Sequence, residues 1–126
     1  MDTHLLEEKF NLFSEGNMLS FENEPEVYYF ALGRVLKWVF AEIGGIDRHR
    51  NEFNYLTNPY MPADIRTLSI RIVTFLKKSK LHSKIQNREL ISMIHLILSR
   101  EKILDQVNAS LRLCENAFYA GLYWKD

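Results

Sequence analysis

Cysteine, proline and glycine are scarce in this sequence. Its 126 residues include one cysteine, three prolines and five glycines. A single cysteine cannot form an internal disulfide, and it excludes a zinc site built on pairs of cysteines. The prolines and glycines fall at places typical of boundaries between helices. The sequence therefore predicts an all-α protein that depends on its apolar core.

Long apolar runs are missing as well. Arg34 and Lys37 interrupt the most apolar stretch, and no run approaches the roughly 18 residues that a membrane span requires. The first four residues, Met-Asp-Thr-His, lack the basic start and apolar core of a signal peptide. Together with the lone cysteine, these features predict a cytoplasmic protein that does not engage a membrane.

The length of the chain predicts one domain. Globular units of this size bury enough surface to stand without a metal or a disulfide. We expect a compact bundle of four to six helices over residues 1–126. Residues 1–22 are interpreted as an acidic N-terminal segment, for which a short helix over residues 3–13 is one possibility, and residues 23–126 are predicted to form the core bundle.

Apolar periodicity predicts where the main helices lie. The strongest begins near residue 24, where Pro25 suits a first helical turn, and ends at Gly44 and Gly45. Apolar residues cover most of its circumference, so we expect it at the centre of the core. Further helices are expected around residues 53–56, over 63–80, over 88–98 after Asn87 as N-cap, and within 108–124, with a loop between 80 and 88.

Charge is distributed very unevenly although the net charge is zero. Residues 1–30 carry seven acids and one base, which is a balance of −6. Residues 65–88, here called the basic segment, carry seven bases and no acid. The seven cations are Arg66, Arg71, Lys77, Lys78, Lys80, Lys84 and Arg88.

Helical spacing predicts that cations of the basic segment share one face. Ile65, Leu68, Ile72, Phe75 and Leu76 fall within about 100° of one another, which is the stripe of a core-facing helix. The arginines and lysines of the same helix fall opposite. Cations without compensating acids repel one another, and phosphate backbone is a natural partner that neutralises them. Because few aromatics share the face, we expect contact with the backbone without sequence-specific readout or base stacking. The alternatives are an acidic partner surface and plain solvent.

Sequence patterns of the common catalytic sites are absent. The chain has no glycine-rich phosphate loop and no His-Glu-x-x-His sequence, and no two of its four histidines lie three or four residues apart. We therefore predict no enzymatic activity, no cofactor and no metal site.

Four stretches of the chain resemble a known family. Residues 29–36 (YFALGRVL), His49, residues 74–80 (TFLKKSK) and residues 115–122 (ENAFYAGL) are similar to the C-terminal helical domain of the type I-B CRISPR large subunit. The resemblance spans roughly residues 24–124. In that family the same domain also occurs as the separate small subunit of the Cascade complex, made from an internal start in the large-subunit frame, and a short chain that begins with methionine fits this case.

The resemblance implies a non-catalytic helical subunit of an antiviral interference complex. Several copies would stack along the complex, contact its large and backbone subunits, and hold the guide RNA–target DNA hybrid and the displaced strand. Carried over to this sequence, the basic segment contacts nucleic acid, and Gly33 and Gly121 are close-packing positions. Independently of the resemblance, Arg48 and Arg50 are second-rank candidates for nucleic-acid contacts, with ordinary surface charge as the alternative. The alternative function is a helical protein–protein adaptor whose acidic and basic segments dock between copies without nucleic acid.

Overall fold

The protein is an all-α bundle. The computed structural model describes residues 25–57, 65–99 and 111–123, and these contain six α-helices, one 3-10 turn and no strand. The acidic N-terminal segment and its predicted short helix lie outside the described residues. The elements are α2 (Pro25–Glu42), η1 (Asp47–His49), α3 (Arg50–Thr57), α4 (Ile65–Leu76), α5 (Ser79–Lys84), α6 (Arg88–Ser99) and α7 (Leu111–Leu122).

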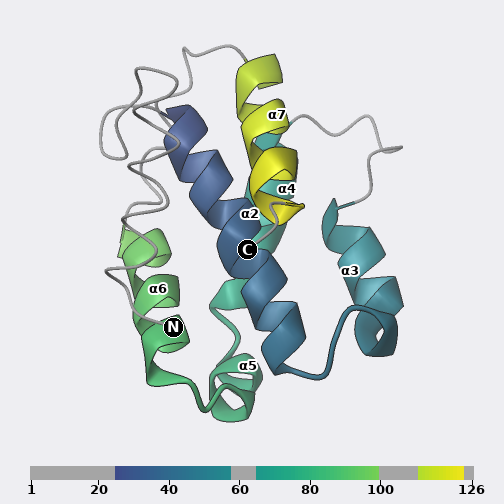
Figure 1. Cartoon of the computed structure of the whole chain (residues 1–126), viewed down its shortest axis with the longest axis vertical. Helices are drawn as coiled ribbons and strands as arrows, with labels where there is room; N and C mark the ends of the chain where they lie inside the picture. Colours follow the sequence, from purple (N-terminus) through teal and green to yellow (C-terminus); the bar gives the residue numbers. More distant parts are fainter. Residues whose placement is uncertain (1–24, 58–64, 100–110, 124–126) are drawn as a thin grey trace.

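Helix α2 is the central element, as its apolar circumference predicts. From Tyr28 to Phe40 every residue except Lys37 is buried. In Figure 1, α2 runs through the middle of the bundle, with α7 crossing it, α6 on one side and α3 on the other. The ring of Phe40 lies 5.3 Å from that of Phe53 on α3 and 5.4 Å from that of Phe75 on α4, so one aromatic cluster joins three helices.

Helices α2 and α7 cross at two glycines. A Cβ added to Gly33 would overlap the backbone oxygen of Phe118 and lie 2.7 Å from the Leu122 nitrogen. A Cβ added to Gly121 would overlap the backbone oxygen of Phe30. The two backbones therefore approach more closely than any side chain at these positions would allow. Both glycines pack closely, as expected, and they lie inside helices instead of at helix boundaries.

A buried arginine stabilises the same crossing. Arg34 on α2 is fully buried, its guanidinium lies 4.4 Å from the Trp38 ring, and its Nη1 donates to the Gly121 carbonyl at 3.5 Å. Cys114 on α7 is also fully buried. A guanidinium in the core needs such polar and aromatic contacts, because an isolated buried charge is costly.

The end of α2 is closed by two glycines and a histidine. Gly44 and Gly45 have φ values of 122° and 97°, and the Gly45 amide donates to the Phe40 carbonyl at 2.7 Å. This bond spans the last turn as in a Schellman motif. His49 Nε2 donates to the carbonyl of Ile43 at 3.0 Å, so a side chain satisfies a carbonyl that the helix leaves unpaired.

Helix α4 is shorter than predicted. It ends at Leu76 and not at residue 80, because the backbone of Lys78 is extended (ψ 128°) and His82 Nε2 donates a hydrogen bond to the Leu76 carbonyl at 2.8 Å. Residues 81–84, predicted as part of a loop, belong instead to the short helix α5 (Ser79–Lys84). The turn between the two helices allows Leu81 and Ile85 to enter the core.

Helices α6 and α7 agree with the sequence pattern. The Asn87 side chain accepts a hydrogen bond from the Leu90 amide at 3.3 Å, which confirms it as the N-cap of α6. Met93, Ile94 and Ile97 of α6 are fully buried.

Among the described helices, none has both the length and the apolarity that a membrane crossing requires.

Candidate nucleic-acid interface

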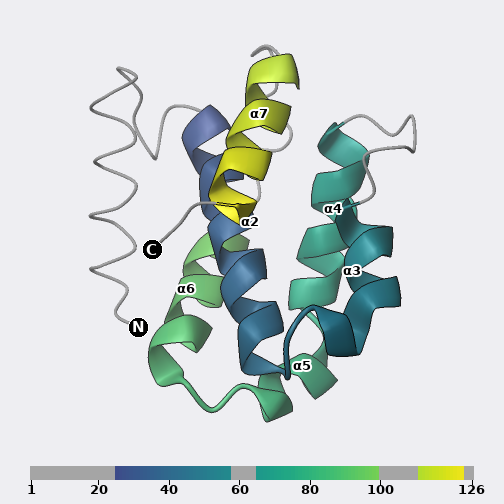
Figure 2. The same ribbon diagram turned by 45° about the vertical axis from the view of Figure 1, so that its right-hand side comes forward.

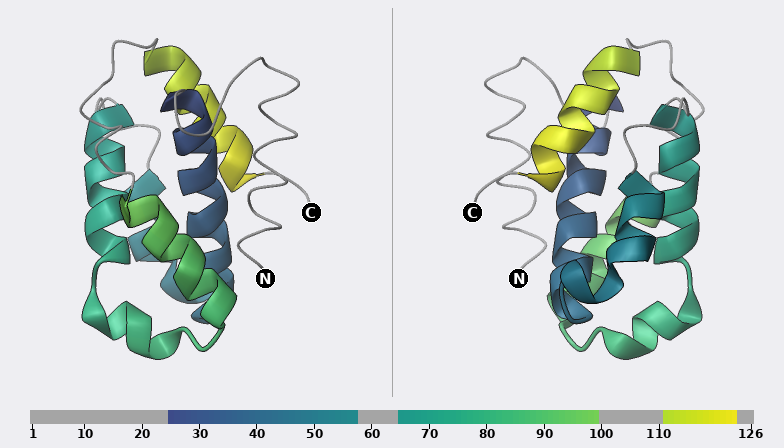
Figure 3. Two further views of the ribbon diagram at one scale, coloured as in Figure 1. Left: turned by 90° about the vertical axis from the view of Figure 1, so that its left-hand side faces the viewer. Right: turned by 90° about the vertical axis from the view of Figure 1, so that its right-hand side faces the viewer.

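The cations of the basic segment gather at one end of the bundle. Helices α2 and α4 both finish there, and α5 connects α4 to the start of α6 (Figure 3). We call this region the α5 end. It receives five of the seven cations: Lys77 and Lys78 directly after α4, Lys80 and Lys84 in α5, and Arg88 as the first residue of α6. All five are exposed. The sequence predicts that these cations share the side of one long helix. Because α4 ends early, most of them lie instead at the end of the bundle.

The core-facing stripe of α4 is confirmed. The five apolar residues predicted to face inward are all buried. The two arginines of α4 lie toward different edges of its outer surface. Arg71 contacts α3, whereas Arg66 shares a row with Ile70, four residues later, whose side chain is 61% exposed. The outer surface of α4 thus has two edges with different neighbours.

Helix α3 covers the edge of α4 that carries Arg71 (Figure 2). The Arg71 guanidinium lies 4.7 Å from the centroid of the Tyr55 ring, and the Lys78 ammonium lies 3.7 Å from Oε1 of Glu52. Lys78 is therefore already paired with a carboxylate of the same chain, and Arg71 is half-buried. Periodicity within α4 places cations on its outer surface but gives no information on which helix packs against their edge.

Lys80, Lys84 and Arg88 have a different environment. All three are exposed, and no carboxylate in the described part of the chain lies within ion-pairing distance of them. An exposed cation without a nearby acid keeps its full attraction for an anion in solution. These three side chains are the best-placed members of the basic segment.

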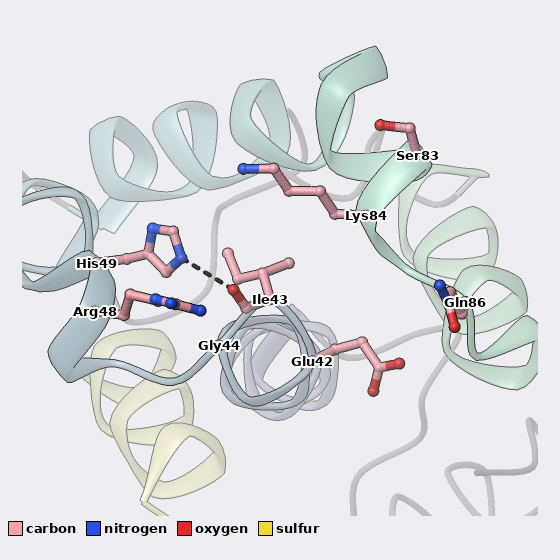
Figure 4. Close-up of a pocket in the computed structure, with 8 residues that line it drawn as sticks. All are labelled: Glu42, Ile43, Gly44, Arg48, His49, Ser83, Lys84 and Gln86. Carbon is pink, nitrogen blue, oxygen red and sulfur yellow. Dashed lines mark hydrogen bonds between the residues drawn. The ribbon is translucent and has the colours of Figure 1, made fainter.

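A cleft at the α5 end brings two of the predicted cations together. It has a volume of about 560 Å³ and lies between the end of α2, η1 and α5. Figure 4 shows Lys84 extending from one wall while Arg48 and His49 lie on the other, and the carboxylate of Glu42 points away from them. Lys84 and the second-rank Arg48 are 36 positions apart in the sequence, so helical spacing could not relate them.

The position of Arg48 depends on Gly44. A Cβ at Gly44 would lie 2.9 Å from Cδ and 3.3 Å from Nη1 of Arg48, so the arginine lies over a glycine whose φ of 122° already disfavours other residues. His49 is held by the Ile43 carbonyl. The cationic wall of the cleft is thus built by the same turn that ends α2.

Arg50, the other second-rank residue, is engaged elsewhere. Its guanidinium forms an exposed ion pair with Asp47, three residues before it. A local pair of this kind contributes little to stability, but it places a carboxylate beside the cation. We therefore rank Arg48 above Arg50 as a contact for an anion.

Within residues 25–57, 65–99 and 111–123, no three metal-binding side chains of His, Cys, Asp or Glu come together. Comparison of the chain with protein-family models, curated proteins and solved structures finds no match. Exposed cations around a polar cleft are suited to phosphate groups.

Proposed function

We propose that this chain binds nucleic-acid backbone through the α5 end, as a non-catalytic accessory subunit of a cytoplasmic CRISPR Cascade complex of the kind that its sequence resembles. In that role it stabilises the guide RNA–target DNA hybrid and the displaced strand. One observation supports the proposal most strongly. Lys80, Lys84 and Arg88 are exposed at one end of the bundle without a described carboxylate nearby.

The physical reasoning concerns counterions. Each phosphate that a lysine or arginine neutralises releases condensed cations from the strand, so binding weakens linearly with the logarithm of salt concentration. Cations that already have a carboxylate partner gain less, because they must give up that partner first. At the α5 end, Lys80, Lys84 and Arg88 have no described carboxylate nearby, whereas Lys78 at the same end and Arg50 each have a carboxylate beside them. The two kinds of cation therefore have different expected contributions.

A matched pair of double variants tests this. Lys80→Gln with Lys84→Gln removes two unpaired charges, and Arg50→Gln with Lys78→Gln removes two paired ones, so the change in net charge is equal. We expect the first variant to reduce the magnitude of the slope of log affinity against log salt for single-stranded DNA by about 1.4, since each single-strand contact contributes roughly 0.7. The second should lower it much less. Fluorescence anisotropy over a salt series measures both slopes.

Three outcomes are informative. A wild-type slope near zero would contradict the proposal and leave the adaptor function, in which copies dock by charge without nucleic acid. Equal effects of the two double variants would show that only net charge matters and that Lys80 and Lys84 are not preferred contacts. Circular dichroism should show unchanged folding for both variants, because all four side chains are exposed.

Membership in the complex needs a separate experiment. A tagged copy isolated from its native host should carry the large subunit, the backbone subunits and guide RNA. Recovery of further copies of the chain alone, without RNA or other subunits, would favour the adaptor alternative. In the assembled complex, the Lys80→Gln, Lys84→Gln variant should weaken engagement of target DNA.

A further inference from the structure

Tyr55 is an exposed aromatic residue beside the basic segment. Its side chain on α3 is 58% exposed, while Arg71 of α4 lies against the ring with a guanidinium-to-centroid distance of 4.7 Å. Arg71 is itself half-buried, and its Nη1 is buried without a hydrogen-bond partner among the described residues. The arginine is therefore held against the helix surface, with the tyrosine ring over its guanidinium.

Two contacts join α3 to the basic segment, and one of them is on this ring. Tyr55 lies three residues after Glu52, so both project from the same side of α3 toward α4. Tyr55 stacks on Arg71 of α4, and Glu52 pairs with Lys78 in the turn directly after α4. The guanidinium covers one face of the ring. The exposed surface of Tyr55 therefore belongs to the other face and to the hydroxyl edge.

An open aromatic face bordered by cations is suited to one kind of ligand. Every nucleobase has a π-face that stacks on an aromatic ring, whatever its sequence, and neighbouring cations hold the phosphates on either side. Within a duplex, bases stack on one another and their faces are covered. A single strand leaves them open.

We infer that Tyr55 and Arg71 form a stacking site for an unpaired nucleobase, with the base against the open face of the Tyr55 ring and Arg71 fixing that ring from behind. The inference rests on the proposed function, because the phosphate contacts at the α5 end bring the strand to the neighbouring helix α3, whose Glu52 pairs with Lys78 of that end. It makes the ligand a single strand, and it differs from the expectation from sequence that bases are not stacked. Helix α3 supplies an aromatic residue that lies outside the basic segment.

Three variants separate stacking from charge. Tyr55→Ala removes the ring, Tyr55→Phe keeps it, and Tyr123→Ala removes another exposed tyrosine, which stacks on Tyr119 beside α7. Each is titrated by anisotropy with a labelled oligothymidylate, with an abasic strand of equal length, and with a duplex. We expect Tyr55→Ala to weaken oligothymidylate binding roughly 5- to 160-fold, which corresponds to the usual loss of about 1–3 kcal/mol per stacked base. Tyr55→Phe and Tyr123→Ala should bind within twofold of wild type.

The abasic strand decides the interpretation. Wild type and Tyr55→Ala should bind it equally and with the same salt slope, because it has phosphates but no base. If Tyr55→Ala binds oligothymidylate as tightly as wild type, the stacking site is wrong, while a salt-dependent affinity still supports the proposed function. An equal loss on the abasic strand would show a charge effect through Arg71 and also overturn the inference. Should Tyr55→Ala fail to fold, wild type alone must still prefer oligothymidylate to the abasic strand.

Discussion

Substitution of Gly33 by alanine tests the closest helix crossing in the bundle. The new Cβ would overlap the Phe118 carbonyl oxygen and lie 2.7 Å from the Leu122 nitrogen, where ordinary van der Waals contact begins at 3.4 Å. Both obstacles are backbone atoms of α7, so no side chain can rotate away to make room. The two helices must separate, which loosens the contacts between them, including the hydrogen bond from Arg34 to Gly121.

The magnitude follows from two opposed effects. Replacing glycine by alanine inside a helix favours folding by about 1 kcal/mol. Overpacking a core costs typically about 1–3 kcal/mol, and a backbone obstacle places this case near the upper limit or above it. We therefore expect a net loss of about 2 kcal/mol, out of a total stability of about 5–15 kcal/mol. With a urea m-value near 2 kcal/mol/M, the unfolding midpoint should fall by roughly 1 M.

The double variant sharpens the test. Gly121→Ala places a Cβ against the Phe30 backbone at the same crossing, so helices already separated by Gly33→Ala accommodate the second methyl group at little further cost. We expect the double variant to lose about 1–2 kcal/mol less than the sum of the single losses. Asn116→Ala, on the exposed surface of α7, is the control and should change stability by less than about 0.5 kcal/mol. Losses that are additive, or close to zero, would refute the reasoning.

Two further predictions concern other joints of the fold. The Tyr119 hydroxyl donates to the Thr57 carbonyl at 3.2 Å, so Tyr119→Phe should cost about 1 kcal/mol in urea unfolding at neutral pH. Burial is the main cause that raises the pKa of Tyr119 above its ordinary value of 10.0, and the charges of nearby groups raise it further. The folded state therefore keeps this proton when the unfolded state loses it, and the stability so provided is complete below about pH 10 and lost as pH rises through the folded pKa. Wild type should accordingly lose stability more steeply than Tyr119→Phe above pH 10, and parallel curves would contradict this. Gly44→Ala and Gly45→Ala both place a side chain on a backbone with positive φ, but only the Cβ of Gly44→Ala displaces Arg48. Gly44→Ala should therefore weaken DNA binding as Arg48→Gln does, while Gly45→Ala should not. Equal DNA binding by both glycine variants would exclude Arg48 as a contact.

Much of the secondary structure follows from local rules. Pro25 at the start of α2, the glycine pair at its end and Asn87 before α6 each act within one helical turn, so the sequence alone predicts their positions. The apolar stripe of α4 is equally local, since helical periodicity alone relates its members. The early end of α4 is different. It depends on a hydrogen bond from His82 to the Leu76 carbonyl across the turn and on the burial of Leu81 in the core, and helical periodicity predicts neither.

The candidate site could be predicted only in part. The sequence shows that the basic segment has seven cations and no acid, and the structure adds that Lys78 is paired with Glu52 while Arg48 and Lys84 line one cleft. Tyr55 could have been noticed as an aromatic outside the core stripe of its helix. Its contact with Arg71 could not, because the two residues belong to different helices.

By itself, the sequence determined the helical class, the central position of α2 and the segment that carries positive charge, since each depends on residues within a few turns of one another. The tertiary structure decided which cations are unpaired, which share a cleft and which aromatic ring lies beside them. The physical reason is that periodicity sets directions within one helix, whereas the neighbours of a side chain depend on which helices pack together.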